Sequence, residues 1–312
     1  MPQSGDEAHG PLVSLQDVAE IELFVVKRMK EYTLGDHDSV FKGSGFNFVG
    51  LRDWEPGDRM SSIDWAQSSL TSFSPLITRE FEQPSNATIM AVVDASLSTR
   101  CGVDGTPIAA AIARAVAAVG LSAVFFQDLF GLITFDGDLR PVATARPKIG
   151  KPHVIYCVDM YQAPPVEREP ERRPAEGRGS LADAIEAQLR KTSLVPVISD
   201  FLFADAGSVI AELSRLNAVH DVFLMMADAR FAYRLPVAAA GWIRVFDVET
   251  GGSRVVSRRE FGRLAEGIER WQNEVVRLAR DADLDIVRVG LDRWEMETTL
   301  VEFAVERRLR KM

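Results

Sequence analysis

Cysteine and histidine are scarce in this sequence of 312 residues, which holds two cysteines and four histidines. The cysteines form no Cys-x-x-Cys motif and no disulfide framework, as is typical of a protein from a reducing compartment. The histidines lie far apart and lack the spacing of a motif such as HExxH, so we expect packing or surface roles for them. The sequence also lacks a Walker A motif, which argues against an intrinsic NTPase activity.

Clusters of basic residues are lacking as well. The formal net charge is −9, and no block of lysine and arginine interrupts the acidic background. A phosphate backbone is bound mainly by such basic patches. We therefore do not expect nucleic acid among the partners.

Long apolar runs are nearly absent. One stretch, residues 108–126, is long enough to cross a bilayer, but it consists mostly of alanine and carries Arg114. An arginine at the centre of a membrane costs about 2.5–3.5 kcal/mol. We therefore expect a buried core helix there, no membrane span, and a soluble, cytoplasmic protein. The polar, acidic N-terminus does not have the pattern of a signal peptide.

Strand and helix patterns alternate from residue 87 onward. Near-continuous apolar strands separated by helices are typical of a mostly parallel sheet that is covered on both faces. We therefore predict an α/β fold with a doubly wound sheet. The expected strands are 88–94, 129–135, 194–199, 221–227 and 285–289, and the expected helices run from about 106 and over 180–191, 206–217, 258–282 and 295–310. Residues 150–162 fit either a strand or a helix, and a Thr-Gly-Gly turn marks a hairpin near 242–256.

The predicted organisation has three parts. Residues 1–86 form an N-terminal extension folded against the main domain, with a helix at 14–33 followed by short strands. Residues 87–257 form the main domain, and 258–312 complete it. The charged, proline-rich stretch 163–179 is the clearest loop.

The stretch VVDASLS places Asp94, Ser96 and Ser98 directly after a buried strand. Alternate side chains of an extended segment point the same way, so three oxygen atoms can converge on one ion. Oxygen ligands that include one or two carboxylates suit Mg²⁺. The alternative is an Asx or Ser turn that caps the following helix.

Further oxygen ligands follow later strands. Asp200 ends the strand VPVISD, and sites in open α/β sheets form beyond the carboxyl ends of the strands. Asp200 could instead cap the helix near 206. Ser180 begins a helix as an N-cap paired with Asp183, a role that is compatible with metal ligation. Asp136 lies beside a hairpin turn, and we assign it to turn chemistry.

These motifs resemble the metal-ion-dependent adhesion site of von Willebrand factor A-like domains. More specifically, the chain is similar to the bacterial domain-of-unknown-function 58 family over roughly residues 40–255. Three blocks carry the resemblance: GLRDWEPGDRMSSIDWAQSS at 50–69, VVDASLS at 92–98 and VPVISDF at 195–201. The residues of the first block are expected to form a buried polar network that ties the N-terminal extension to the sheet, rather than a catalytic site.

The resemblance implies a von Willebrand factor A-like fold with Mg²⁺ or Mn²⁺ on Asp94, Ser96 and Ser98. It places Asp200 in the site through a water molecule and Ser180 at the position where such domains more often have threonine. It also implies a non-catalytic adaptor or chaperone-like module that takes an acidic side chain of a partner protein and works with a MoxR-type AAA+ ATPase.

Two other functions remain open at this point. A metal-dependent hydrolase of the phosphoesterase kind would use Asp94 and Asp200 around the same ion. A purely structural domain would bind no metal at all.

Overall fold

The computed structural model describes residues 11–34, 47–55, 60, 63–82, 87–103, 106–163, 180–203, 205–229, 242–246 and 253–290. The chain divides into two compact units. Met1–Arg28 and Ala87–Met312 form the first unit, and Met29–Asn86 form the second. Each unit is described by itself.

A six-stranded sheet forms the centre of the first unit, in the order β12-β9-β8-β3-β6-β7. All neighbouring strands are parallel except the pair β6 and β7. The strands are β3 (Thr88–Asp94), β6 (Leu129–Phe135), β7 (Pro141–Lys148), β8 (Leu194–Ser199), β9 (Asp221–Ala227) and β12 (Asp285–Val289). The predicted α/β fold with a mostly parallel sheet is confirmed.

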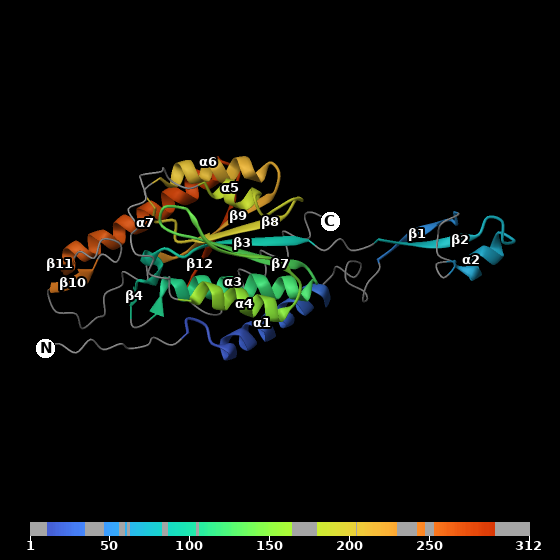
Figure 1. Ribbon diagram of the computed structural model, residues 1–312, viewed down its shortest axis with the longest axis horizontal. Coiled ribbons are helices and arrows are strands. Elements are labelled where there is room, and N and C mark those ends of the chain that lie inside the picture. Colours follow the sequence, from blue (N-terminus) through green and yellow to red (C-terminus); the bar gives the residue numbers. More distant parts are fainter. Residues whose placement is uncertain are drawn as a thin grey trace. The chain divides into compact units, whose positions relative to one another are not determined.

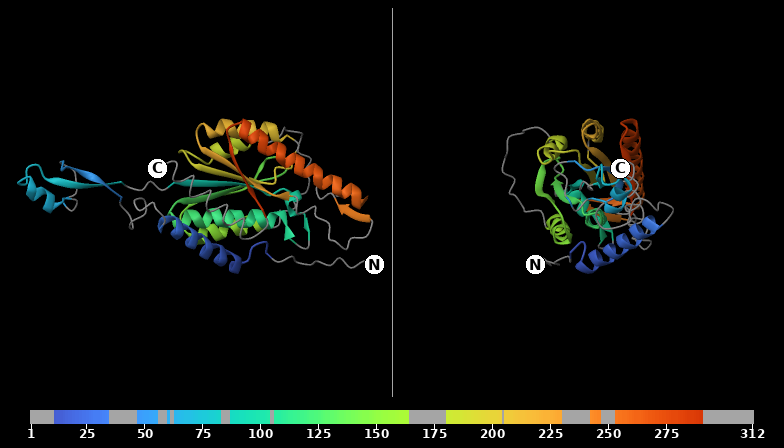
Figure 2. Two further views of the ribbon diagram at one scale, coloured as in Figure 1. Left: turned by 180° about the vertical axis from the view of Figure 1, so that it is seen from behind. Right: turned by 90° about the vertical axis from the view of Figure 1, so that its right-hand side faces the viewer.

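Helices cover both faces of this sheet (Figures 1 and 2). One face carries α1 (Leu15–Leu34), α3 (Ile108–Phe125) and α4 (Lys151–Gln162), and the other carries α5 (Leu181–Glu186), α6 (Ala206–Asn217) and α7 (Arg258–Asp281). The smaller elements of this unit are the 3₁₀ turn Leu97–Arg100, β4 (Gly102–Val103), β5 (Thr106–Pro107), β10 (Trp242–Phe246) and β11 (Ser253–Ser257). This two-sided covering explains why β3, β6, β8 and β9 are almost continuously apolar.

The order of the strands reverses between β3 and β8. From β3 the chain moves to β6 and β7 on one side of the sheet, then returns to β8, β9 and β12 on the other side. Open α/β sheets bind ligands beyond the carboxyl ends of the strands at such a reversal point. The loops after β3 and β8 are therefore the first place to look for a site.

Most predicted elements agree with the structure. The ambiguous stretch is the helix α4, in which Val154, Val158 and Tyr161 face the core. The helix predicted at 180–191 is shorter and ends at Glu186, after which the N–H of Gln188 bonds the carbonyl of Ile185 in a tighter turn. The last predicted helix, 295–310, and the predicted loop 163–179 beyond its first residue lie outside the described residues.

The apolar stretch 108–126 is the core helix α3. Within the described residues, it is the one helix that is long and apolar enough to cross a membrane, and most of its residues are buried inside the unit. Its buried residues pack against strands β3 and β6 and against α4. Packing inside the fold accounts for its apolar composition.

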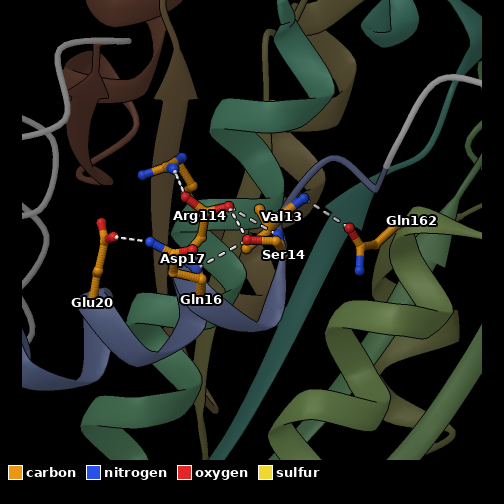
Figure 3. Close-up of polar contacts among 7 residues, drawn as sticks. All are labelled: Val13, Ser14, Gln16, Asp17, Glu20, Arg114 and Gln162. Carbon is orange, nitrogen blue, oxygen red and sulfur yellow. Dashed lines mark hydrogen bonds and ion pairs between the residues drawn. The ribbon is translucent and has the colours of Figure 1, made fainter.

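Three polar contacts attach α1 to α3 and α4, and Figure 3 shows two of them. The guanidinium of Arg114 donates to Asp17 Oδ1 at 2.6 Å, and the N–H of Val13 donates to Gln162 Oε1 at 2.8 Å. Lys151 on α4 pairs with Glu22. Asp17 Oδ2 also accepts a hydrogen bond from the N–H of Ser14, so this carboxylate both caps α1 and binds α3.

The second unit contains β1 (Asn47–Asp53), α2 (Trp65–Leu70) and β2 (Ile77–Glu82), with β1 and β2 paired antiparallel. Asp64 caps α2 by accepting from the N–H groups of Ala66 and Gln67. The hydroxyl of Ser68 donates to the carbonyl of Ile77 and accepts from its N–H, which ties α2 to β2. Asp64 and Ser68 thus make polar contacts within the second unit, and the predicted network between the 50–69 block and the main sheet stays a prediction. Residues 56–59, 61 and 62 lie outside the described residues.

Gly131 in β6 should not tolerate a side chain. A Cβ there would lie 2.9 Å from the carbonyl oxygen of Ala145 and from the nitrogen of Pro147, both backbone atoms of β7. Backbone atoms of a paired strand cannot move aside cheaply, so we expect Gly131→Ala to lower the free energy of unfolding by about 1–3 kcal/mol. Urea denaturation followed by circular dichroism measures this change.

The matched control is Gly267→Ala in α7. No atom lies within 4 Å of a Cβ at Gly267, and alanine favours a helix over glycine by about 0.5–1 kcal/mol. This variant should be slightly stabilised. Equal effects of the two substitutions would show that the close approach at Gly131 does not constrain the sheet.

Asp17→Ala should destabilise the first unit. The side chain of Arg114 is 17% exposed, so loss of its carboxylate partner leaves a largely buried cation with fewer acceptors, and the bond from the N–H of Ser14 to this carboxylate at the start of α1 is lost as well. We expect a loss of about 2–3 kcal/mol in the same urea experiment. Glu20→Ala is the control, because Glu20 is an exposed acid of the same helix whose contact with Gln16 lies at the surface. A loss below about 0.5 kcal/mol, the range of surface substitutions, would contradict the attachment.

Candidate metal centre

Asp94 and Asp200 lie at the carboxyl ends of two neighbouring strands. Asp94 is the last residue of β3, and Asp200 directly follows β8. Because Val93 pairs with Ile198 in parallel register, the two strands end side by side at the reversal point of the sheet. Both residues are buried, with 2% and 1% of their surface exposed. Both residues thus lie at the carboxyl ends of neighbouring strands, as predicted, and a metal site there stays a prediction.

The loop after β3 holds the two serines of the motif. The N–H of Ser96 donates to Asp94 Oδ1 at 2.9 Å, which is an Asx turn, and the hydroxyl oxygens of Ser96 and Ser98 lie 3.0 Å apart. Ser96 precedes the 3₁₀ turn but makes no side-chain cap bond. The Asx turn of the alternative interpretation is therefore present, whereas the capping by serine is not. The two hydroxyls face one another instead.

Asp200 forms a similar turn at the end of β8. Its Oδ1 accepts a hydrogen bond from the N–H of Leu202 at 3.0 Å. The cap of α6 is Asp205, which accepts from the N–H of Ser208. The alternative prediction that Asp200 caps this helix is wrong, because the chain needs five more residues before the helix begins at Ala206.

The carboxylates of Asp94 and Asp200 both raise the pKa of Tyr161 on α4. Its hydroxyl donates to the backbone carbonyl of Asp94 at 3.1 Å, and its side chain is fully buried. Burial raises the pKa of Tyr161 well above its ordinary range, the charge of Asp94 raises it further, and Asp200 acts in the same direction. The Arg100 guanidinium opposes these two carboxylates by lowering the pKa of Tyr161, but the phenol stays neutral at physiological pH.

Ser180 occupies a different environment. It is the N-cap of α5, where its hydroxyl accepts from the N–H of Asp183 and donates to Glu212 Oε1 on α6 at 2.6 Å. The predicted helix-capping role is confirmed. The hydrogen bonds described for this hydroxyl join Ser180 to α5 and α6, and ligation by Ser180 stays a prediction.

Sequence patterns did not point to Ser199, the residue before Asp200. Its side chain is fully buried, and its hydroxyl donates to Asp94 Oδ2 at 2.6 Å. The one feature of the sequence that could have indicated Ser199 is its place as a serine at the end of an apolar strand. Its partner lies 105 residues away, so only the pairing of β3 with β8 reveals the contact.

Two residues of α7 also reach this edge. The buried amide of Gln272 donates to the carbonyl oxygens of Asp200 and Ala227, and the indole N–H of Trp271 donates to that of Phe201. Phe201 has a φ of 55°, which a residue other than glycine rarely adopts. These bonds to α7 hold the loop after β8 in an uncommon conformation.

Among the described residues, no group of three or more His, Cys, Asp and Glu side chains could hold a metal ion. A centre at Asp94 would be of another kind, with two carboxylates and two hydroxyls.

Asp136 accepts hydrogen bonds from the N–H groups of Asp138 and Arg140 and stabilises the β6–β7 turn, as predicted. Burial raises the pKa of the Cys157 thiol to about 12, so this cysteine is a poor ligand and nucleophile at neutral pH.

The donors at this edge fit Mg²⁺ or Mn²⁺ in chemical type. Asp94, Asp200, Ser96 and Ser98 offer oxygen atoms alone, which hard divalent cations prefer. A carboxylate oxygen has two lone pairs, so accepting one hydrogen bond does not prevent it from binding a cation. Two buried carboxylates near one another gain from a positive charge between them.

Comparison with solved structures gives distant likenesses. A conserved hypothetical protein, BatB from Bacteroides thetaiotaomicron, is 14% identical, with a TM-score of 0.41, over 71% of this chain and 100% of that one. An aerotolerance-related membrane protein from Bacteroides fragilis is 13% identical, with a TM-score of 0.42, over 73% of this chain and 100% of that one. No curated protein matches the sequence at a significant level.

The family comparison identifies a family. Residues 50–270 match the family model described as protein of unknown function DUF58. This range contains the 50–69 block, the Asp94 loop and the end of β8, whose structures are described above. Since the match covers more than half of the sequence, the chain belongs to the DUF58 family.

Proposed function

We propose that this chain is a non-catalytic protein-binding module that depends on Mg²⁺ or Mn²⁺. Asp94, Ser96 and Ser98 would hold the ion directly, and Asp200 would act through a water molecule. The observation that carries the proposal is the buried Asp94 carboxylate beside two hydroxyl oxygens that lie 3.0 Å apart, at the reversal point of the sheet.

The charge of the proposed ligands favours an acidic partner. Asp94 would be the single carboxylate that binds the ion directly, and the serine hydroxyls are neutral, so a divalent cation would keep a net positive charge. Magnesium also retains water molecules that another oxygen ligand can replace. When bound, the ion would supply an open position for a carboxylate of a partner protein.

The proposed partner is a MoxR-type AAA+ ATPase. The resemblance to von Willebrand factor A-like and domain-of-unknown-function 58 proteins supports this pairing, with the module acting as an adaptor or chaperone-like factor. The acidic net charge of −9 favours a protein partner over nucleic acid. We further propose that the module acts in the cytoplasm.

Mg²⁺ should stabilise the protein through Asp94. A ligand that binds only the folded state at about 100 times its Kd adds about 2.7 kcal/mol to the free energy of unfolding. We expect Mg²⁺ or Mn²⁺ to raise the Tm of the wild type and to leave the Tm of Asp94→Asn unchanged. Differential scanning calorimetry with and without EDTA measures both.

Asp205→Asn is the matched control for this experiment. Asp205 is an exposed cap of α6, and asparagine caps a helix about equally well, so this variant should respond to metal like the wild type. Absence of stabilisation in the wild type at millimolar metal would refute the metal centre. A metal response that persists in Asp94→Asn would place the ion elsewhere.

Binding to the ATPase should require the metal centre. We expect a MoxR-type ATPase from the same genome to bind the wild type in Mg²⁺ and to lose binding in EDTA or in Ser98→Ala. Ser208→Ala removes an exposed serine on α6 and should bind normally. Biolayer interferometry measures the affinities, and binding that survives both EDTA and Ser98→Ala would contradict the proposed mode of recognition.

A further inference from the structure

Ser199 is held in one orientation at the edge of the sheet. It is the last residue of β8, and the parallel register of Val93 with Ile198 brings it beside Asp94 on β3. No part of its surface is exposed. Its position is set by the sheet itself, whereas Ser96 and Ser98 lie in a loop.

Two hydrogen bonds fix the direction of the Ser199 hydroxyl. The hydroxyl oxygen accepts a hydrogen bond from the N–H of Phe201 at 2.8 Å, and the O–H group donates one to Asp94 Oδ2 at 2.6 Å. A hydroxyl has a single proton, so the bond to Asp94 uses its entire donor capacity. Hydrogen bonds from a hydroxyl to a carboxylate are short and strong, as is observed here.

The two carboxylate oxygens of Asp94 accept hydrogen bonds from two different parts of the chain. Oδ1 accepts from the N–H of Ser96 in its own loop, and Oδ2 accepts from Ser199 on the neighbouring strand. Rotation about the terminal torsion of an aspartate is soft, so one donor alone would define the carboxylate plane poorly. A second donor on the rigid sheet fixes that plane.

We propose that Ser199 is a positioning residue of the metal centre, which orients the Asp94 carboxylate for the ion without binding the ion itself. This inference rests on the proposed function, because it assigns a role toward the same ion. Groups that hydrogen-bond metal ligands set the orientation of those ligands, and their loss weakens metal affinity by about 10–100-fold. Ser199 acts on Asp94 in this way.

Mn²⁺ titration of the full chain tests the role of Ser199, with free Mn²⁺ followed by its electron paramagnetic resonance signal. We expect Ser199→Ala to raise the Kd for Mn²⁺ by about 10–100-fold. Ser199→Thr keeps the hydroxyl and should restore an affinity close to that of the wild type. Thermal unfolding in EDTA verifies that each variant is folded at the temperature of the titration.

Ser122→Ala is the matched control, because Ser122 is a buried serine of α3 whose hydroxyl bonds the carbonyl of Ala118 within the helix. It should alter the unfolding temperature in EDTA and leave the Kd for Mn²⁺ unchanged. A Kd for Ser199→Ala equal to that of the wild type would overturn the role of Ser199 while the metal centre stands. A wild type that binds no Mn²⁺ would refute the centre itself, and the inference with it.

Discussion

The burial of the Asp94 carboxylate is the constraint on which the candidate site depends. An ionised carboxylate that leaves water is strongly destabilised unless hydrogen bonds or an opposite charge compensate it. Asp94 is 2% exposed and accepts bonds from the N–H of Ser96 and the hydroxyl of Ser199. Asp200, directly after the neighbouring strand, adds a second buried carboxyl group. The fold thus places acidic groups where a cation would relieve their repulsion, and this is the physical basis of the proposed metal centre.

The sheet and α7 together impose this arrangement. The strand order reverses between β3 and β8, whose carboxyl ends lie side by side in parallel register. Gln272 joins the ends of β8 and β9 by bonding one carbonyl oxygen from each. A buried carbonyl oxygen without a donor is costly, so α7 both satisfies these groups and fixes the loop that carries Asp200. The geometry of the site therefore rests on long-range contacts of backbone and side chains.

The sequence was sufficient to predict the strands at 88–94, 129–135, 194–199 and 221–227, because buried parallel strands are short continuous apolar runs. It also identified Asp94 and Asp200, since both follow such runs directly. It could not identify Ser199, whose role depends on which strands pair, nor Gln272, which is polar in a highly charged helix. It left the 150–162 stretch undecided because its β-branched residues suit a strand while their spacing suits a helix. Local sequence patterns predict individual strands and helices, whereas the strand pairing that brings the site residues together depends on residues far apart in the sequence.

The contact between Arg114 and Asp17 also bears on the order in which the chain is made. α3 is apolar over almost its entire length, so it would expose a large apolar surface as it leaves the ribosome. Its partner in α1 lies 97 residues earlier in the sequence. At about 5–20 residues per second, α1 is synthesised roughly 5–20 s before α3. A helix that covers α3 is therefore already present when α3 emerges, while the strands β6 and β8 are still to be translated.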